Sequence, residues 1–153
     1  MPRVVKFWLY YNIYIAFINA VWYNVIMAIK GIGVDIAEIS RLSGIVDRYG
    51  EKFLGRVYTA AEAELCVCAG ELRAARLAGR FAVKEAFYKA LPAAAQRASS
   101  WKSIQVLADG AGRPRVDVCD ERLRRALADC GVASVHVSIS HERTHCVAVV
   151  VLE

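Results

Sequence analysis

The segment from Leu72 to Leu91 constrains the fold of this chain more than any other. It ends directly before Pro92, and its apolar residues follow the spacing of a long helix. At the helical repeat, one charged stripe consists of Arg73, Arg80 and Lys84, and a second consists of Glu85 and Lys89. Phe81 and Tyr88 lie between the two stripes, and the far side of the helix is apolar. A helix that is apolar around most of its circumference is buried in a globular protein. We therefore predict one long central helix that other elements cover.

Helix caps and turn residues divide the rest of the chain into short elements. The predicted elements before the long helix are a strand over Ala28–Val34, a helix that Asp35 caps with Glu38 three residues on, and a helix that begins with the capping box Thr59-Ala60-Ala61-Glu62 and runs to about Gly70. Those after it are a loop over Ala93–Ser100, a hairpin of Ser103–Ala108 and Arg115–Val118, a helix over Asp120–Cys130 ended by Gly131, and strands over Ser134–Ser140 and Cys146–Leu152. This order predicts an α+β fold, with helices grouped early and an antiparallel sheet late.

The 153 residues suffice for a single domain, but the beginning of the chain differs in composition from the rest. No charged residue occurs over 7–29, and basic residues flank this stretch, as in a membrane-spanning or signal-anchor helix. Three asparagines interrupt it, and Met27 directly precedes the first predicted strand. We favour an upstream extension of the reading frame over 1–26 and a domain over 27–153. A membrane anchor and an additional packed helix or strand stay open as alternatives.

The net charge of +5 favours a polyanion or an acidic partner, without choosing between nucleic acid, a membrane surface and an acidic protein. The sequence has no Lys/Arg run of the kind found in nucleic-acid-binding tails. The five cysteines are odd in number and lack the paired spacing of a zinc site. They also do not form the pattern of a disulfide framework. We expect reduced cysteines in a cytoplasmic protein.

Two carboxylates, Asp35 and Glu85, lie within apolar segments. Such placement is costly unless the carboxylate meets a cation, a metal or a reacting group. Taken singly, Asp35 is explained as a helix cap and Glu85 as the i,i+4 partner of Lys89. Taken with the basic residues Arg80 and Lys84, they suggest magnesium-dependent transfer of a phosphate-linked group. That chemistry needs a hard cation on oxygen ligands and basic side chains on the phosphates.

Polar side chains alternate with apolar ones near the C-terminus, which places Ser138 and Ser140 on one face of a strand and His141 at its tip. Adjacent strand residues point to opposite faces, so Ser140 and His141 are poorly placed to share a proton. We therefore expect these residues to bind a ligand rather than to act as a nucleophile and its base.

Taken together, these segments resemble the holo-acyl-carrier-protein synthase type of 4'-phosphopantetheinyl transferase. The matching residues are Gly31-Ile32-Gly33-Val34-Asp35-Ile36 with Glu38 and Arg41, Gly79-Arg80-Phe81-Ala82-Val83-Lys84-Glu85-Ala86 with Lys89, Gly112 with Pro114, and Val137-Ser138-Ile139-Ser140-His141. Their order covers nearly all of Ala28 to Glu153. The chain departs from the family pattern after Lys89, where Leu91–Arg97 replaces the usual glycine-rich turn, and in the extension before Met27.

The resemblance implies the 4'-phosphopantetheinyl transferase fold, a homotrimer, and transfer of phosphopantetheine from coenzyme A to a serine of apo acyl carrier protein. The by-product would be 3',5'-ADP, and the pathway fatty-acid biosynthesis in the cytoplasm. By the same resemblance, Asp35 and Glu85 hold Mg²⁺, Glu85 helps to deprotonate the serine, and Lys89 stabilises the leaving phosphate. Coenzyme A would be contacted by Arg80, Lys84, Lys89, Gly112, Pro114, Ser140 and His141, with Arg80 and Lys84 either binding phosphates or fixing the cleft.

Acyl carrier proteins are acidic, so Arg41 and Arg48, on one face of the first predicted helix, form the expected docking site. The alternative hypothesis is a non-catalytic module that binds an acidic carrier protein. In that module Asp35 would be a helix cap only.

Overall fold

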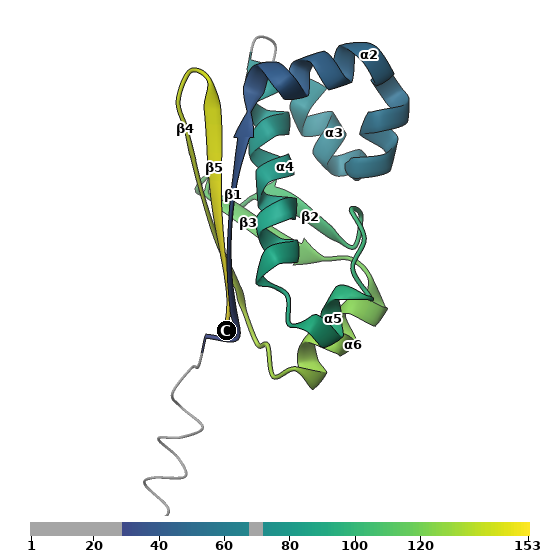
Figure 1. The fold of residues 1–153 in the computed structure, drawn as a ribbon, viewed down its shortest axis with the longest axis vertical. Helices are drawn as coiled ribbons and strands as arrows, with labels where there is room; N and C mark the ends of the chain where they lie inside the picture. The colour runs from purple at the N-terminus through teal and green to yellow at the C-terminus, as the bar shows by residue number, and fades with distance from the viewer. Residues whose placement is uncertain (1–28, 68–71) are drawn as a thin grey trace, which may run out of the picture.

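The computed structural model describes residues 29–67 and 72–153, and Figure 1 shows their arrangement. The elements are β1 (Gly31–Glu38), α2 (Ile39–Val57), α3 (Ala60–Val67), α4 (Arg73–Ala90), α5 (Ala93–Gln96), β2 (Ile104–Ala108), β3 (Pro114–Val118), α6 (Glu121–Asp129), β4 (Val135–His141) and β5 (His145–Leu152). This is the predicted α+β class.

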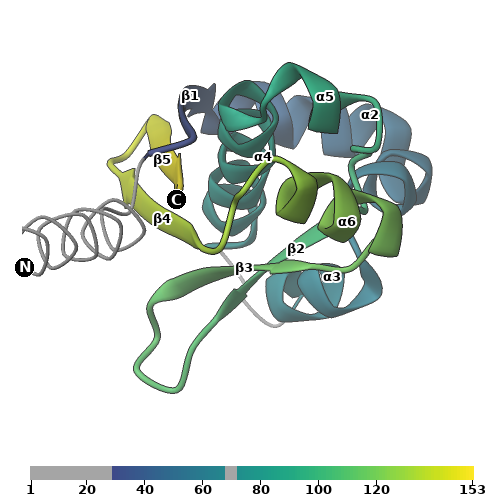
Figure 2. The same cartoon turned by 90° about the horizontal axis from the view of Figure 1, so that it is seen from below.

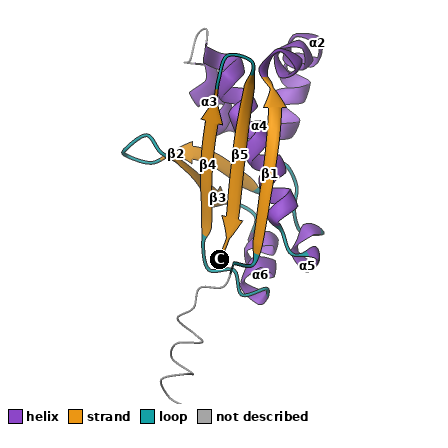
Figure 3. Cartoon of the chain, turned by 60° about the vertical axis from the view of Figure 1, so that its left-hand side comes forward, coloured by secondary structure: helices purple, strands orange, loops and turns teal. Residues whose placement is uncertain are grey.

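An antiparallel sheet of three strands in the order β1-β5-β4 packs against α4, which is the long central helix predicted from the sequence (Figures 2 and 3). Strand β5 lies in the middle, so the first strand and the last two form one sheet. The β2–β3 hairpin packs on α4 and beside β4. The buried face of α4 includes Ala82, Val83 and Ala86, none of which is exposed to solvent. Small side chains here allow the strands to approach the helix closely.

Two glycines in β1 bring the strand backbone into contact with α4. A Cβ atom on Gly33 would lie 1.9 Å from the carbonyl oxygen of Ala86, and one on Gly31 would lie 1.8 Å from that of Ala90. Only residues without a side chain fit at these distances. The close approach places Asp35, two residues after Gly33 on the same strand face, beside the turn of α4 that carries Glu85 and Lys89.

The prediction that Asp35 caps a helix is wrong. Strand β1 continues to Glu38, and Asp35 pairs with Ala148 of β5 within the ladder. The helix α2 begins at Ile39, and Glu38 is its N-cap residue without a side-chain capping bond. Backbone pairing with β5, which is distant in sequence, outweighs the local capping signal in this segment.

Two other predicted elements differ from the structure. The helix after β1 extends to Val57, with a break at Gly50 (φ 50°), beyond the apolar stripe recognised in the sequence. The segment predicted as a loop after Pro92 contains the short helix α5, whose Ala95 is buried. Three alanines in this helix fit its formation, because alanine has the highest helix propensity.

The predicted capping box and the late elements are confirmed. The backbone N–H of Thr59 donates to Oε2 of Glu62 (2.8 Å), and that of Glu62 donates to Oγ1 of Thr59 (3.3 Å). Asp120 caps α6 by accepting the N–H of Arg122 at 2.8 Å. The predicted end of α3 near Gly70 lies outside the described residues.

The face of the sheet that points away from α4 carries apolar side chains exposed to solvent. Ile32, Val34 and Ile36 of β1 are 57%, 51% and 63% exposed, respectively. They lie opposite Val151, Val149 and Val147 of β5. Such a continuous apolar surface is typical of an interface with another molecule.

No helix within 29–67 and 72–153 has the length and apolarity needed to cross a bilayer. The predicted membrane-anchor alternative concerns the segment before these residues and lies outside the described part of the chain.

Candidate active site

Asp35 and Lys89 form an ion pair between β1 and α4. The Lys89 ammonium donates to Oδ1 of Asp35 at 2.7 Å and to the carbonyl oxygen of Val34 at 3.2 Å. Lys89 therefore binds the strand carboxylate rather than forming the simple i,i+4 pair with Glu85 considered from the sequence. The Asp35 side chain is only 15% exposed, whereas that of Lys89 is half exposed. A basic group thus lies at the mouth of a partly buried acidic site.

Glu85 completes this group of charges one helical turn before Lys89. Burial raises the pKa of the Glu85 carboxyl, the negative charge of Asp35 raises it further, and Lys89 acts in the opposite direction. Asp35 and Glu85 therefore lie close enough to repel each other, and one ammonium does not compensate both. Such a pair of carboxylates suits a hard divalent cation whose other ligands are water or phosphate oxygens. The described residues contain no group of three or more His, Cys, Asp and Glu side chains arranged around a metal, so a cation here would need such outside ligands.

The pKa of Glu85 should fall when Asp35→Asn removes the neighbouring negative charge. The same substitution also leaves the positive charge of Lys89 to act on Glu85 alone. A ¹³C NMR titration of the Glu85 carboxyl in buffer with a chelator measures this shift directly. Asp47→Asn, on the exposed side of α2, serves as the control and should leave the titration unchanged. A Glu85 pKa that is equal in Asp35→Asn and the unchanged protein would contradict the proposed coupling.

Two pockets meet at Glu85. One of about 240 Å³ lies between β1, α2 and α4, and its lining includes Asp35, Arg41 and Phe81. The other, of about 370 Å³, is lined by Tyr88 and Trp101 among others. Glu85 contributes to the lining of both pockets.

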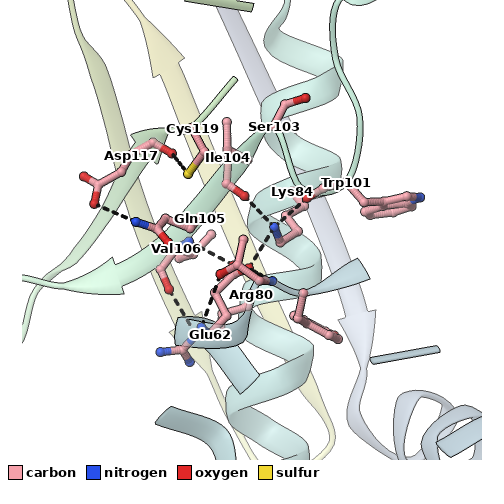
Figure 4. A network of polar contacts seen from close by, with 12 residues as sticks. Glu62, Arg80, Lys84, Trp101, Ser103, Ile104, Gln105, Val106, Asp117 and Cys119 are labelled. Atoms are coloured by element: carbon pink, nitrogen blue, oxygen red, sulfur yellow. Dashed lines mark hydrogen bonds and ion pairs between the residues drawn. The ribbon is translucent and has the colours of Figure 1, made fainter. Parts of the chain in front are cut away.

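Lys84 is among the residues that line the larger pocket, and its ammonium lies in a buried polar network (Figure 4). It donates to the carbonyl oxygens of Trp101 (2.6 Å) and Ile104 (2.7 Å), and it forms an ion pair of 3.0 Å with Oε2 of Glu62. Burial lowers the pKa of Lys84, and Glu62 acts against this effect. Protein groups occupy this ammonium, and the expected contact of Lys84 with coenzyme A stays a prediction. The structure favours its other predicted role, fixing the cleft.

Glu62 is the residue of this network that sequence reasoning missed. Its carboxylate is fully buried and accepts hydrogen bonds from the backbone N–H groups of Thr59 and Val106 as well as from Lys84. The capping box identified Glu62 as a helix cap, but its second role depends on β2, which is distant in sequence. The sequence offered one sign that Glu62 is buried, namely the apolar residues next to it in the capping segment.

Arg80 lies one turn before Lys84 and braces the same region. Its Nε donates to the carbonyl oxygen of Val106 at 3.1 Å, and a terminal nitrogen donates to that of Arg76 at 3.2 Å. Among the described residues, neither pocket beside Glu85 includes Arg80. Its contacts therefore hold β2 against α4.

The other residues expected to bind coenzyme A come from the β2–β3 hairpin and from the end of β4. Gly112 (φ 80°) lies in the β2–β3 turn, and Pro114 begins β3. Ser140 and His141 are exposed at the end of β4. None of these four lines either pocket at Glu85. By strand register across β5, Ser140 and His141 lie level with Ile36 and Ala37 of β1, and the expected contacts with coenzyme A stay a prediction.

Of the two predicted docking arginines, Arg41 lies in the first turn of α2 and lines the smaller pocket. Arg48 lies further along the same helix, with its guanidinium 5.5 Å from the centre of the Tyr49 ring. Both are exposed, so α2 presents positive charge next to the carboxylate site.

The sequence is similar to those of curated proteins over most of its length. A holo-[acyl-carrier-protein] synthase from Halothermothrix orenii is 42% identical over 127 residues, which cover 82% of this chain and 98% of that protein. A holo-[acyl-carrier-protein] synthase from Edwardsiella ictaluri is 39% identical over 127 residues, covering 83% and 99%.

The fold is similar to those of solved structures. The holo-[acyl-carrier-protein] synthase from Neisseria meningitidis matches with a TM-score of 0.71 and 32% identity, covering 82% of this chain and 99% of that one. The Helicobacter pylori synthase, solved in complex with coenzyme A, matches with a TM-score of 0.66 and 29% identity, covering 80% and 99%. Residues 31–150 match the model of one family, and the protein therefore belongs to the 4'-phosphopantetheinyl transferase superfamily.

Proposed function

We propose that this protein is a magnesium-dependent holo-[acyl-carrier-protein] synthase. It transfers the 4'-phosphopantetheine group from coenzyme A to a serine of apo acyl carrier protein, giving holo acyl carrier protein and 3',5'-ADP. The observation that carries this proposal is the convergence of Asp35, Glu85 and Lys89 where two pockets meet. Curated relatives that match over nearly their whole length are holo-[acyl-carrier-protein] synthases, and a separate structural neighbour, the Helicobacter pylori synthase, was solved in complex with coenzyme A.

The carboxylates of Asp35 and Glu85 would hold Mg²⁺, which supplies positive charge to neutralise the phosphate oxygens of coenzyme A. Glu85 accepts the proton of the serine hydroxyl as the serine oxygen bonds to the phosphorus that carries the pantetheine. The bond from phosphorus to the bridging oxygen breaks, and its electron pair leaves with 3',5'-ADP. The Lys89 ammonium donates a hydrogen bond to that leaving phosphate.

Release of 3',5'-ADP separates the enzyme from the non-catalytic alternative. The protein is incubated with coenzyme A, Mg²⁺ and a panel of apo carrier proteins, and nucleotide products are separated by chromatography. An enzyme produces 3',5'-ADP only when carrier is present. A module that binds carrier in the same tubes without producing this nucleotide would support the alternative instead.

The exposed positive charges of α2 support docking of an acidic carrier at Arg41 and Arg48. We expect Arg41→Ala/Arg48→Ala to raise the KM for apo carrier about tenfold and to weaken its salt dependence, because rim charges mainly steer association. Arg56→Ala, in the last turn of the same helix beyond the break at Gly50, is the matched control. Equal carrier KM values for the double variant and the control would exclude this docking face.

The apolar outer face of the sheet supports the homotrimer implied by the family resemblance. Exposed Ile32, Val34 and Ile36 would be covered by a second copy, which could also bring its own Ser140 and His141 toward a neighbouring site. We expect Val34→Glu to convert the trimer to monomers in light scattering, because a charge cannot be buried unpaired in such an interface. Tyr49→Glu, on an exposed part of α2, should leave the assembly intact. A monomeric unsubstituted protein, or a trimeric Val34→Glu variant, would contradict this assembly.

We also propose that residues 27–153 contain the whole catalytic domain, that the protein acts in fatty-acid biosynthesis, and that it is cytoplasmic. The match to the family over 31–150 supports the first point. The last two follow from the resemblance of the site motifs to enzymes that modify fatty-acid carrier proteins.

A further inference from the structure

The ammonium of Lys89 is held by two oxygen atoms of β1 at once. It donates to Oδ1 of Asp35 at 2.7 Å and to the carbonyl oxygen of Val34 at 3.2 Å. The two acceptors belong to consecutive residues of the strand, so two of the three N–H groups of the ammonium are directed to β1. In this structure, Lys89 is therefore the counter-ion of Asp35.

Lys89 reaches Asp35 from outside the pocket that Asp35 lines. Asp35 and Glu85 both belong to the lining of the smaller pocket, and Lys89 is not among its described lining residues. The side chain of Lys89 is 50% exposed, against 15% for that of Asp35. An exposed lysine in the last turn of a helix has many accessible rotamers, whereas Asp35 belongs to a paired strand. Of the two partners, Lys89 is the one that can leave with little rearrangement.

A divalent cation bound to Asp35 would compete with this ammonium. The two carboxylates carry two negative charges, and the ammonium already balances one of them. A second cation on the same carboxylate repels the ammonium, even if it binds the other oxygen. A cation that enters by itself offers the displaced ammonium only water in place of its 2.7 Å hydrogen bond. A cation that enters with a diphosphate offers it anionic oxygen atoms, which are much stronger acceptors.

We propose that the divalent cation replaces Lys89 at Asp35, and that this exchange is favourable only when the cation arrives with the diphosphate of coenzyme A. This inference rests on the proposed function. In the empty protein, Lys89 competes with the cation for Asp35. In the loaded protein, Lys89 transfers its hydrogen bond to a phosphate oxygen, as its proposed part in the reaction requires. Lys89 thereby couples the binding of the cation to the binding of coenzyme A, and this coupling is reciprocal.

The first test measures Mn²⁺ binding to the full chain without nucleotide, from the electron paramagnetic resonance signal of the unbound ion. Mn²⁺ prefers the same oxygen ligands as Mg²⁺. Lys89→Met should bind Mn²⁺ about tenfold more tightly than the unsubstituted protein, because no charge-assisted hydrogen bond has to be broken first. The Lys89 side chain is half exposed, so this substitution leaves the core intact.

Arg41→Met is the matched control for the loss of a positive charge. Arg41 lines the same pocket as Asp35, but among the described residues the ion-pair partner of Asp35 is Lys89. The Mn²⁺ affinity of Arg41→Met should therefore stay within about threefold of the unsubstituted value. Equal Mn²⁺ affinities of Lys89→Met and the unsubstituted protein, or of Lys89→Met and Arg41→Met, would overturn the exchange.

The second test measures the coupling itself. The affinity for coenzyme A is determined by calorimetry with and without saturating Mn²⁺, with the binding of Mn²⁺ to coenzyme A in solution subtracted. The gain in affinity that Mn²⁺ gives should be about tenfold larger in the unsubstituted protein than in Lys89→Met, which has no ammonium to exchange. An equal gain in the two proteins would contradict the proposed coupling.

The exchange and the proposed function can fail separately. If the protein modifies a carrier while Lys89→Met binds Mn²⁺ no more tightly than the unsubstituted protein, the exchange is wrong and the function stands. If both Mn²⁺ effects are observed but no carrier gains phosphopantetheine, the exchange of cation and ammonium stands and the function is wrong.

Discussion

Glu85→Gln should lower kcat for phosphopantetheine transfer by about 10³-fold, since removal of a catalytic base costs about 10²–10⁴ and a cation ligand is lost with it. Glutamine has nearly the same shape, but its amide neither accepts the serine proton nor carries the charge that would hold a divalent cation. Asp35→Asn should also lower kcat, and it additionally breaks the ion pair with Lys89. Initial rates of holo carrier formation at saturating substrates measure both effects.

The stability of Glu85→Gln should change in the opposite direction from its activity. A carboxyl whose pKa is raised in the folded protein stabilises the fold below its unfolded pKa and loses that contribution as the pH rises through the folded value. At neutral pH, the amide should therefore leave the free energy of unfolding equal or slightly higher. Glu64→Gln, on the exposed side of α3, controls for loss of charge alone. Retention of a third or more of kcat by folded Glu85→Gln would exclude Glu85 as the base.

Lys84→Met should lower the free energy of unfolding by about 3–5 kcal/mol, the usual cost of leaving the partner of a buried ion pair without its counter-charge. The Lys84 side chain is 1% exposed and that of Glu62 is 0% exposed, so water cannot replace the lost contact. The carbonyl oxygens of Trp101 and Ile104 also lose a donor. Urea unfolding followed by circular dichroism measures the change.

Two further variants isolate the cause of this loss. Lys102→Met, at an exposed position of the same region, should leave stability within about 0.5 kcal/mol of the unsubstituted value. Adding Glu62→Gln to Lys84→Met removes the unpaired buried charge and should recover part of the loss. If the double variant is less stable than Lys84→Met by the full cost of a second independent substitution, the two side chains are not coupled.

Local sequence signals predicted the elements whose stability is local. The capping box at Thr59 and Glu62, the hairpin turn with Gly112 and the cap at Asp120 all have partners within a few residues. Asp35 had an equally good local signal, but its strand pairs with β5, more than a hundred positions away. A local signal cannot show which distant strand competes with it, and for this reason the predicted cap was wrong.

The candidate site also has residues that the sequence predicted and residues that it did not. The charge pattern and the family resemblance singled out Asp35, Glu85 and Lys89, and the structure brings all three to one place. The helical stripe that contains Lys84 gave no sign that this side chain is turned into the core, because its partners lie on α3 and in the loop before β2. Trp101 and the pockets at Glu85 depend on packing between segments that no local spacing relates.

The most direct test of the central claim is the intact mass of an apo acyl carrier protein after incubation with this protein, coenzyme A and Mg²⁺. The account predicts that the carrier gains the mass of one phosphopantetheine group. It also predicts no gain for a carrier whose acceptor serine is replaced by alanine, and almost none with Glu85→Gln in place of the unsubstituted protein. Carriers of several pathways that all keep their apo mass, with a folded protein that binds coenzyme A, would contradict it.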